Sequence, residues 1–559
     1  MTAVAPLSPT ANIASHLPVM ARDAPDRAAI VSPARGGWRT MTFAELDARS
    51  DEYAAGLEAI GVSRGVRTIM MVPPSPEFFA LVFGLFKVGA VLVLIDPGIA
   101  RKALLACLRE VHGEAFIGVP RAHLARMLFP ESFRDVKSVV TVGRKLGWGG
   151  HTLDDVLRLG GGRTHEMSTP EPGETAAILF TSGSTGVPKG VVYTHEMFDA
   201  QVRSIRSTYG IVPGEIDLPT FPLFALFDPA LGMTAVLPDM DFRFPSLADP
   251  AKLIEALSAH HCTNMFGSPA LLDNLGRYGA SHGVKLPHLK RVLSAGAPVR
   301  TDVLEQMSAI LSPDAQVFTP FGATESLPVA SIGSHEVLRD TARGAAEGRG
   351  VCVGKPVLGS VVRIIGITDD AIPEWSAGLE VPTGTIGEIT VRGPVVTHEY
   401  YARADATRLA KIREGGDVVH RMGDVGAFDD EGRLWMCGRK SHRIESRTGV
   451  LFTVPVEEVL NTHWLVCRTA LVGVGERGSQ RPIVLIERRP HRGPNRLASD
   501  AVLVRELMAL AAKHEVTREL RSFKVYPGTF PVDTRHNAKI EREKLAVWAA
   551  SHVREGAGS

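Results

Sequence analysis

Short apolar runs with strand-like composition alternate with helical stretches through most of this 559-residue chain. Four of the runs are TAAILFTSG, TNMFGS, LKRVLSAGAP and AQVFTPFGATE, at residues 175–183, 263–268, 289–298 and 315–325. Helical stretches such as 251–260 and 301–311 lie between them. Alternation of this kind predicts a layered α/β architecture, in which ligands bind at the carboxyl ends of the strands.

The most apolar stretch, FFALVFGLFKVGAVLVLIDPG, covers residues 78–98. Lys87 divides it into two runs that are both shorter than the roughly 20 residues needed to cross a membrane. The stretch instead predicts a buried helix, a turn at Gly89 and a buried strand that ends at Asp96-Pro97. The amino terminus has no basic start followed by an apolar core, so we expect no signal peptide, no transmembrane segment and a cytoplasmic location.

The composition excludes several other classes of protein. The formal net charge is +1, which gives no general basic field for nucleic acid, so we expect none as a partner. The five cysteines are scattered without a CxxC pair, so neither a disulfide framework nor a zinc ribbon is predicted. His260-His261-Cys262 has no second group of ligands nearby, and we interpret it as structural.

The length exceeds the roughly 250–300 residues at which single cores stop growing, which predicts several domains. We place a large domain at residues 1–437, a hinge at 438–442 and a small α+β domain at 443–559. Short strands with Gly/Pro turns predict a small β-rich unit at 366–401 of the large domain. The basic loop at 487–496 is either a solvated hairpin tip or a docking surface for a partner. In the small domain, the patterns predict helices at 455–463 and 500–515 and strands at 469–475, 482–488 and 522–526.

The stretch TRHNAKIEREKL, close to the carboxyl terminus, combines several cations and anions. Mixed charges near a terminus are typical of a water-facing surface. Ile540, Val547 and Trp548 recur at helical spacing, which predicts a short amphipathic helix from about Ile540. Lys539 then lies at the boundary between loop and helix, and local sequence alone does not assign it a role.

The stretch ILFTSGSTGVPKGVVYTH at 178–195 predicts a phosphate-binding loop. After an apolar strand come six residues that are glycine or carry a hydroxyl, namely Thr181, Ser182, Gly183, Ser184, Thr185 and Gly186. Glycines allow backbone amides to turn toward an anion, hydroxyls add donors, and Lys189 adds positive charge. The loop is not of the Walker type, because Gly186 and Lys189 are separated by two residues and no GK[ST] follows.

This loop resembles, almost residue for residue, the phosphate loop of the adenylate-forming superfamily of acyl-CoA synthetases, peptide-synthetase adenylation domains and luciferases. Further stretches resemble that superfamily's motifs in the same order: SAGAP (294–298), PFGATES (320–326), GKPVLG (354–359), GEITVRGPVV (387–396), RMGDVG (421–426), CGRKSHRIE (437–445) and RHNAKIER (535–542). The resemblance extends from about Ala28 to Leu545. It implies a large multi-subdomain N-terminal domain and a small mobile C-terminal domain.

The resemblance also implies that the chain uses ATP and Mg²⁺ to activate a carboxylate. A carboxylate is a poor nucleophile toward the α-phosphate because two anions must meet, so the enzyme has to offset charge on phosphate and pyrophosphate. Lys539 would align the carboxylate, Thr324 would donate to the α-phosphate, and Glu325 would hold the metal. The loop at 181–190 would bind the β- and γ-phosphates.

For the nucleoside, the resemblance implies that Asp424 accepts hydrogen bonds from both ribose hydroxyls, a task that suits an acceptor-only side chain. Arg439 would lie beside the ribose, and Phe321 would stack on adenine. Gly296, Ala297 and Gly322 belong to the matching adenine-side motifs. Two structural interpretations stay open: Asp424 as the cap of a turn, and Arg439 as an interdomain ion pair.

The chain departs from the acyl-CoA-forming pattern at several positions. Ala225 follows Pro-Leu-Phe224 where those relatives have a histidine gate, and with Phe227 these residues are candidates for the substrate pocket. A smaller residue at 225 would make room for a substrate branched at its α-carbon. At the hinge, His442 replaces an aspartate, and the lysine loop has Asn537-Ala538 in place of Ser-Gly.

Together these features look most like the β-lactone synthetases of bacterial long-chain olefin biosynthesis. That resemblance implies adenylation of a fatty-acid-derived 2-alkyl-3-hydroxy acid, followed by attack of its own 3-hydroxyl, so that CoA is not required. A tethered nucleophile has a high effective molarity, which helps to offset the strain of a four-membered ring. The resemblance also leaves open a complex between this chain and other enzymes of olefin biosynthesis. The alternatives are a medium- or long-chain acyl-CoA ligase and a non-catalytic binder of ATP or acyl groups.

Overall fold

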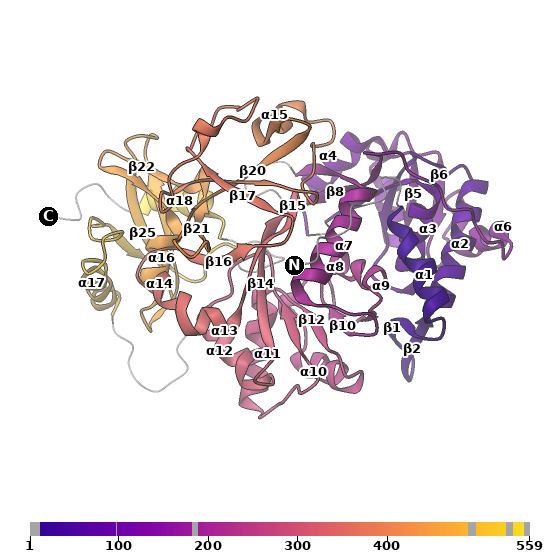
Figure 1. Ribbon diagram of the computed structural model, residues 1–559, viewed down its shortest axis with the longest axis horizontal. Coiled ribbons are helices and arrows are strands. Elements are labelled where there is room, and N and C mark those ends of the chain that lie inside the picture. Colours follow the sequence, from indigo (N-terminus) through magenta and orange to yellow (C-terminus); the bar gives the residue numbers. More distant parts are fainter. Residues whose placement is uncertain (1–11, 97, 182–187, 490–498, 533–539, 553–559) are drawn as a thin grey trace.

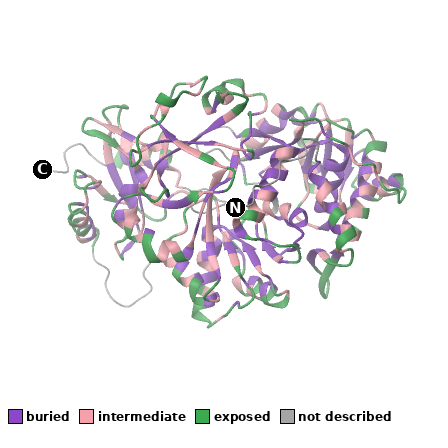
Figure 2. Cartoon of the chain, viewed as in Figure 1, coloured by how far each residue is buried: buried purple, intermediate pink, exposed green. Residues whose placement is uncertain are grey.

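The computed structural model describes residues 12–96, 98–181, 188–489, 499–532 and 540–552. Within them the first two strands belong to a larger sheet, the next seven form a seven-stranded sheet, and the chain then completes the larger sheet before it enters a small carboxyl-terminal α+β unit (Figure 1). The central strands are buried, and exposed residues gather at loops and on the outer faces of helices (Figure 2). The predicted layered α/β architecture is confirmed.

The seven-stranded sheet has the strand order β7-β6-β5-β3-β4-β8-β9 within the described residues. Its strands are β3 (Arg67–Met71), β4 (Val91–Ile95), β5 (Ala115–Gly118), β6 (Ser138–Thr141), β7 (His151–Thr152), β8 (Thr175–Thr181) and β9 (Lys189–Thr194). Its connecting helices are α3 (Pro76–Val88), α4 (Arg101–Val111), α5 (Pro120–Leu128) and α6 (Leu153–Gly160). Only β8 and β9 pair antiparallel, and Thr181 pairs with Lys189, so the two ends of the predicted phosphate loop are held side by side.

The helix, turn and strand predicted for residues 78–98 are confirmed by α3 and β4. Between them Gly89 has a φ of 78°, a left-handed conformation that glycine adopts without a Cβ clash. Lys87 of α3 is only 1% exposed, and its Nζ lies 2.6 Å from carboxylate oxygens of both Asp47 and Asp51 on α2 (Phe43–Ala59). This pairing explains how an apolar helix accommodates a charge. In the described part of the chain, no helix is long and apolar enough to span a membrane.

The larger sheet has 14 strands in the described residues, in the order β17-β18-β20-β21-β16-β15-β14-β13-β12-β10-β11-β1-β2, with β19 on β20. They are β1 (Ala28–Ala34), β2 (Gly37–Thr42), β10 (Ile216–Pro219), β11 (Thr234–Val236), β12 (Asn264–Phe266), β13 (Arg291–Leu293), β14 (Gln316–Ala323), β15 (Ser326–Gly333), β16 (Val351–Pro356), β17 (Val361–Ile365), β18 (Gly387–Arg392), β19 (Lys411–Glu414), β20 (Asp417–Phe428) and β21 (Leu434–Arg439). Nearby helices are α7 (His195–Tyr209), α10 (Pro250–Ala259), α11 (Pro269–Ser281) and α12 (Thr301–Ile310). The antiparallel hairpin of β14 and β15 has Thr324 and Glu325 at its tip.

The β-rich unit is wider than the predicted 366–401. It comprises β16 to β21, shares a core that includes Ile389, Val391 and Leu434, and continues the larger sheet because β16 pairs with both β15 and β21. Hydrogen bonding across β16 therefore fixes this unit to the hairpin that carries Thr324 and Glu325.

The carboxyl-terminal unit contains β24, β25 and β26 in a separate sheet with its own core. Its elements are β22 (Ile444–Ser446), β23 (Gly449–Leu451), α16 (Thr453–Asn461), β24 (Val466–Val474), β25 (Arg481–Arg488), α17 (Asp500–Ala511), β26 (Phe523–Val525) and α18 (Arg542–His552). Each predicted helix and strand here is found within a few residues of its predicted position. The predicted inward face of the last helix is wrong at Val547, which is 73% exposed. Ile540 pairs with Val532 before the helix begins, and Leu545 and Ala549, four residues apart, face the core.

Candidate functional site

A cavity of about 2710 Å³ brings together most of the described candidate residues. The candidates that line it are Lys189, Phe224, Phe227, Gly296, Ala297, Phe321, Gly322, Thr324, Glu325, Asp424, Arg439 and His442. These come from both sheets, from the short helices α8 (Pro222–Ala225) and α9 (Phe227–Leu231), from the loop after β13 and from the segment after β21. The sequence separates them by up to about 250 residues. The cavity is larger than a typical ligand pocket of about 300–1,000 Å³, so a nucleotide and a long second substrate can both be accommodated.

Several predicted residues lie outside the described part of the chain. They are Ser182, Gly183, Ser184, Thr185, Gly186 and Lys539, together with Asn537 and Ala538. The structure does describe the last strand residue before the loop, Thr181, and the first after it, Lys189. The roles assigned to these eight residues stay predictions.

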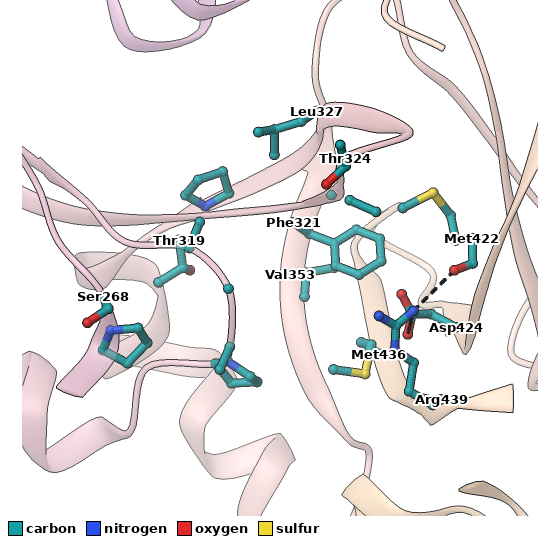
Figure 3. A pocket seen from close by; sticks show the side chains of 18 of the residues that line it. Ser268, Thr319, Phe321, Thr324, Leu327, Val353, Met422, Asp424, Met436 and Arg439 are labelled. Atoms are coloured by element: carbon teal, nitrogen blue, oxygen red, sulfur yellow. Dashed lines mark hydrogen bonds and ion pairs between the residues drawn. The ribbon is translucent and has the colours of Figure 1, made fainter. Parts of the chain in front are cut away.

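Three of the nucleoside candidates, Phe321, Asp424 and Arg439, lie close to one another on the cavity wall (Figure 3). Asp424 of β20 and Arg439 of β21 are partners in register, and Arg439 Nη1 lies 3.3 Å from Asp424 Oδ1. Arg439 also donates to the Met422 carbonyl at 3.3 Å. Asp424 therefore presents its carboxylate from the middle of a sheet, while Phe321 and Met436 form an apolar wall beside it. The interpretation of Arg439 as an interdomain ion pair is therefore not what the described residues show, because Arg439 pairs with Asp424 inside this sheet.

Glu325, the candidate for the metal, lies at the tip of the β14–β15 hairpin and lines the cavity. The Tyr400 hydroxyl donates to Glu325 Oε1 at 2.6 Å. Among the described residues, no lysine or arginine forms an ion pair with this carboxylate. Burial, with the charge of Glu325, raises the pKa of Tyr400 far above its usual value, so the phenol stays a proton donor.

These surroundings fit a magnesium ion that arrives with ATP. The described residues contain no group of three or more histidine, cysteine, aspartate or glutamate side chains that could hold a metal by themselves. Magnesium is commonly held by only one or two carboxylates together with substrate phosphates and water. Glu325, which forms no ion pair with a described lysine or arginine, presents a carboxylate of this kind on the cavity wall.

Aromatic side chains form the candidate acyl pocket. Phe224 stacks on Phe266 with ring centroids 4.1 Å apart, and Phe227 lies 6.3 Å from Phe198. Ala225 differs from the expectation, because it does not line the cavity and is only 1% exposed within the main core. The reduced size at 225 therefore does not widen the cavity wall directly.

Comparison with known proteins identifies the wider group. The sequence matches the family described as AMP-binding enzyme over residues 18–401. The chain belongs to the AMP-binding enzyme family.

Within this family, the chain is 51% identical to an olefin β-lactone synthetase of Xanthomonas campestris, with 96% of this chain and 97% of that protein covered. It is 50% identical to an olefin β-lactone synthetase of Stenotrophomonas maltophilia, with 98% and 99% covered. Its fold is similar to that of an amide bond synthetase from Marinactinospora thermotolerans, at a TM-score of 0.77 and 22% identity, with 96% of this chain and 99% of that chain covered.

Several polar residues around the site of this AMP-binding enzyme carry no signal in the sequence. The Tyr193 hydroxyl donates to the Thr324 carbonyl, and Gln201 Nε2 donates to the Leu327 carbonyl at 3.0 Å, so α7 and β9 together support the hairpin. Lys411 is buried beneath Tyr400 and donates to the carbonyl and the hydroxyl of Thr397. No motif marked these residues, because their contacts arise only when distant segments pack together.

The segment after β21 makes ion-pair contacts with both the carboxyl-terminal unit and the β-rich unit of this AMP-binding enzyme. His442 lies 3.3 Å from Glu543 of α18, and burial, followed by the charge of Arg542, lowers the pKa of His442 to about 4. Lys440 Nζ lies 3.0 Å from Glu388 Oε1 of β18. His442 is therefore neutral near pH 7, and the substitution of the usual aspartate removes a negative charge from the predicted hinge.

A second set of ion pairs converges on the half-exposed carboxylate of Asp369. It lies 2.8 Å from Arg443 Nη2 and 2.9 Å from Arg477 Nη1. Asp369 belongs to the β-rich unit, whereas Arg443 and Arg477 belong to the carboxyl-terminal unit, so one carboxylate links the two.

The ionisation of Lys411 gives a testable pH dependence. Burial lowers the pKa of Lys411 to about 7, and the charge of Glu325 opposes that shift. An unfolded lysine has a pKa of about 10.4, so between these values the unfolded chain binds more protons and stability rises with pH. We expect Lys411→Met to remove up to about 1.4 kcal/mol per pH unit of this rise in the free energy of unfolding. Denaturant unfolding of both proteins from pH 7 to 9 measures the difference, and parallel pH profiles would show that Lys411 stays charged.

Proposed function

We propose that this AMP-binding enzyme adenylates a 2-alkyl-3-hydroxy long-chain fatty acid and then closes the product to a β-lactone, with release of AMP and pyrophosphate. The observation that carries the proposal is the identity of 51% and 50%, over almost the whole chain, to two proteins named olefin β-lactone synthetase. The large cavity supports it, since polar nucleotide candidates and an aromatic pocket share the same space.

In the first step, a substrate carboxylate oxygen attacks the α-phosphorus of ATP, and the bond to pyrophosphate breaks. Lys539 aligns the two anions, and Thr324 donates to the α-phosphate. Magnesium bound with ATP supplies positive charge that stabilises the developing phosphate charge. The role of Glu325 is to hold that ion, while Lys189 and the loop at 181–186 bind the outer phosphates.

Binding of the nucleoside depends on the end of the cavity shown in Figure 3. Asp424 accepts hydrogen bonds from the ribose hydroxyls. Arg439 keeps the Asp424 carboxylate oriented through the 3.3 Å contact between Arg439 Nη1 and Asp424 Oδ1. Phe321 packs against adenine, with Gly296 and Ala297 on the adenine side of the cavity.

In the second step, the substrate's 3-hydroxyl oxygen attacks the acyl carbon and the bond to AMP breaks. The hydroxyl proton is released to solvent, the four-membered ring closes within one molecule, and no thiol takes part. The apolar walls around Phe224 and Phe227 suit the two alkyl arms of the acid and limit access of water to the mixed anhydride. We further propose that residues 438–442 act as a hinge between a domain at 1–437 and one at 443–559.

A product analysis tests this function. The protein is incubated with ATP, magnesium and a 2-alkyl-3-hydroxy acid, with and without CoA, and the products are identified by mass. We expect β-lactone and AMP in equal amounts under both conditions. A thioester that forms only with CoA would replace the proposal with an acyl-CoA ligase, and the absence of any AMP would favour a non-catalytic binder.

The role of Glu325 predicts an altered response to magnesium. Glu325→Gln keeps the size of the side chain and an acceptor for Tyr400, but it removes the charge that binds the metal. We expect activity at limiting magnesium to fall at least about tenfold, and to recover in part at high magnesium. Titration of magnesium at fixed ATP measures this. A variant with the wild-type titration curve would place the metal on another residue.

A further inference from the structure

The segment 396–401 connects the two predicted catalytic regions through its backbone. On one side, Tyr400 forms a bridge with Val191 of β9, and the Tyr401 amide donates to the Gly190 carbonyl at 2.7 Å. On the other side, the amide and hydroxyl of Thr397 donate to the Glu325 carbonyl at 2.9 and 3.1 Å. This segment therefore joins the strand that begins with Lys189 to the hairpin tip that carries Glu325.

The Tyr400 side chain repeats the same connection inside the cavity. Its hydroxyl donates to Glu325 Oε1 at 2.6 Å, while Lys189 Nζ lies 4.6 Å from the centre of its ring. A cation above an aromatic face is attracted by the ring quadrupole, and a hydrogen bond to an ionised acceptor is stronger than a neutral one. Tyr400 is 5% exposed, so its hydrogen bond to Glu325 forms largely away from water, whereas Lys189 is an exposed residue.

We infer that Tyr400 is a positioning residue. It holds Glu325, the carboxylate proposed to bind magnesium, at a fixed separation from Lys189, the lysine proposed to bind the outer phosphates. This inference rests on the roles proposed above for Glu325 and Lys189. The hydroxyl occupies Oε1 of Glu325 and leaves Oε2 as the oxygen that would hold the metal, in the manner of the partners that orient metal ligands in other sites. The ring holds the Lys189 ammonium group where the outer phosphates bind.

The neighbouring tyrosine lacks these contacts. Tyr401 directs its hydroxyl to the Val111 carbonyl at 3.5 Å, on the other side of the segment.

Burial keeps Tyr400 protonated, since it raises the pKa of the phenol. Lys411, 5.9 Å from the centre of the same ring, donates to Thr397 and supports the segment from below.

Two substitutions separate the hydroxyl from the ring. Tyr400→Phe removes only the hydrogen bond to Glu325, and Tyr400→Leu also removes the ring beneath Lys189. Tyr209→Phe is the matched control, because Tyr209 is also buried, donates to Ser331 Oγ at 3.2 Å and does not line the cavity. The burial of Tyr209 also raises its pKa, to about 12.

The first measurement is the calorimetric affinity for ATP with and without magnesium, which requires no turnover. We expect Tyr400→Phe to lose about tenfold in the affinity gained from magnesium, with unchanged affinity for ATP alone. Tyr400→Leu should lose affinity for ATP under both conditions. Tyr209→Phe should match the wild-type protein in every titration.

The second measurement is acid-dependent exchange of pyrophosphate into ATP over a range of magnesium concentrations. For Tyr400→Phe we expect half-maximal exchange at about tenfold more magnesium, with a maximal rate close to that of the wild-type protein. Superimposable magnesium curves for Tyr400→Phe and wild type, or an equal shift in Tyr209→Phe, would overturn the inference. If the wild-type protein binds magnesium-ATP but makes no lactone, the proposed function fails while the role of Tyr400 is still measured.

Discussion

The Lys539→Ala variant is expected to form acyl-adenylate at least about a hundredfold more slowly than the wild-type protein, which is the scale for losing a group that stabilises transition-state charge. Affinity for ATP should change little, because Phe321, Asp424 and Arg439 lie in the large sheet and keep their contacts. Release of pyrophosphate in the presence of the acid measures the chemical step, and calorimetry measures binding of ATP.

Lys513→Ala is a suitable control for this loss. Lys513 is an exposed lysine of the same carboxyl-terminal unit and does not line the cavity, so its removal changes the net charge equally. It should leave pyrophosphate release unchanged. A wild-type rate in Lys539→Ala would mean that another cation aligns the carboxylate, and the motif assignment would be wrong.

Removal of the 3-hydroxyl from the substrate is expected to have the second large effect. The deoxy acid keeps the carboxylate and both alkyl arms, so the adenylate should still form. Without the internal nucleophile no ring can close, and the steady-state rate of AMP release should fall to that of slow hydrolysis or dissociation. Rapid-quench measurement of adenylate together with continuous measurement of AMP separates the two steps.

CoA provides the control for that experiment. If the cavity has no working path for a thiol, CoA should leave both the normal acid and the deoxy acid unaffected. Conversion of the deoxy acid to a thioester, at a rate comparable with lactone formation, would show that the chain is an acyl-CoA ligase. A normal rate of AMP release with the deoxy acid alone would show that water, and not the 3-hydroxyl, accepts the acyl group.

Much of the site could be predicted because its residues lie in short local motifs. Phe321, Thr324 and Glu325 belong to one short motif, and Asp424 and Arg439 each belong to another, so their order along the chain was informative before any packing was known. The structure places all five on one cavity. The helices and strands of the carboxyl-terminal unit were similarly evident from their periodicity.

The rest depended on tertiary packing. Tyr400 and Tyr401 are adjacent and chemically identical, and only the pairing of their segment with β9 and the β14–β15 hairpin places one of them on Glu325. Ala225 was misplaced because the direction of a side chain in a one-turn helix is not encoded by periodicity. Val547 was misplaced because Ile540 lies in a β-bridge before the helix, so its spacing to Val547 does not mark one helical face.

The ion pairs at Asp369 influence the energetic cost of moving the carboxyl-terminal unit. Because that carboxylate is half exposed, water and counterions can replace Arg443 and Arg477 in the hinge motion proposed above, whereas an apolar contact would have to expose new surface. Dissolved salt screens such charges over about 8 Å at physiological ionic strength. Any step of the catalytic cycle in which the two parts separate should therefore become faster as ionic strength rises, and a step in which they rejoin should become slower.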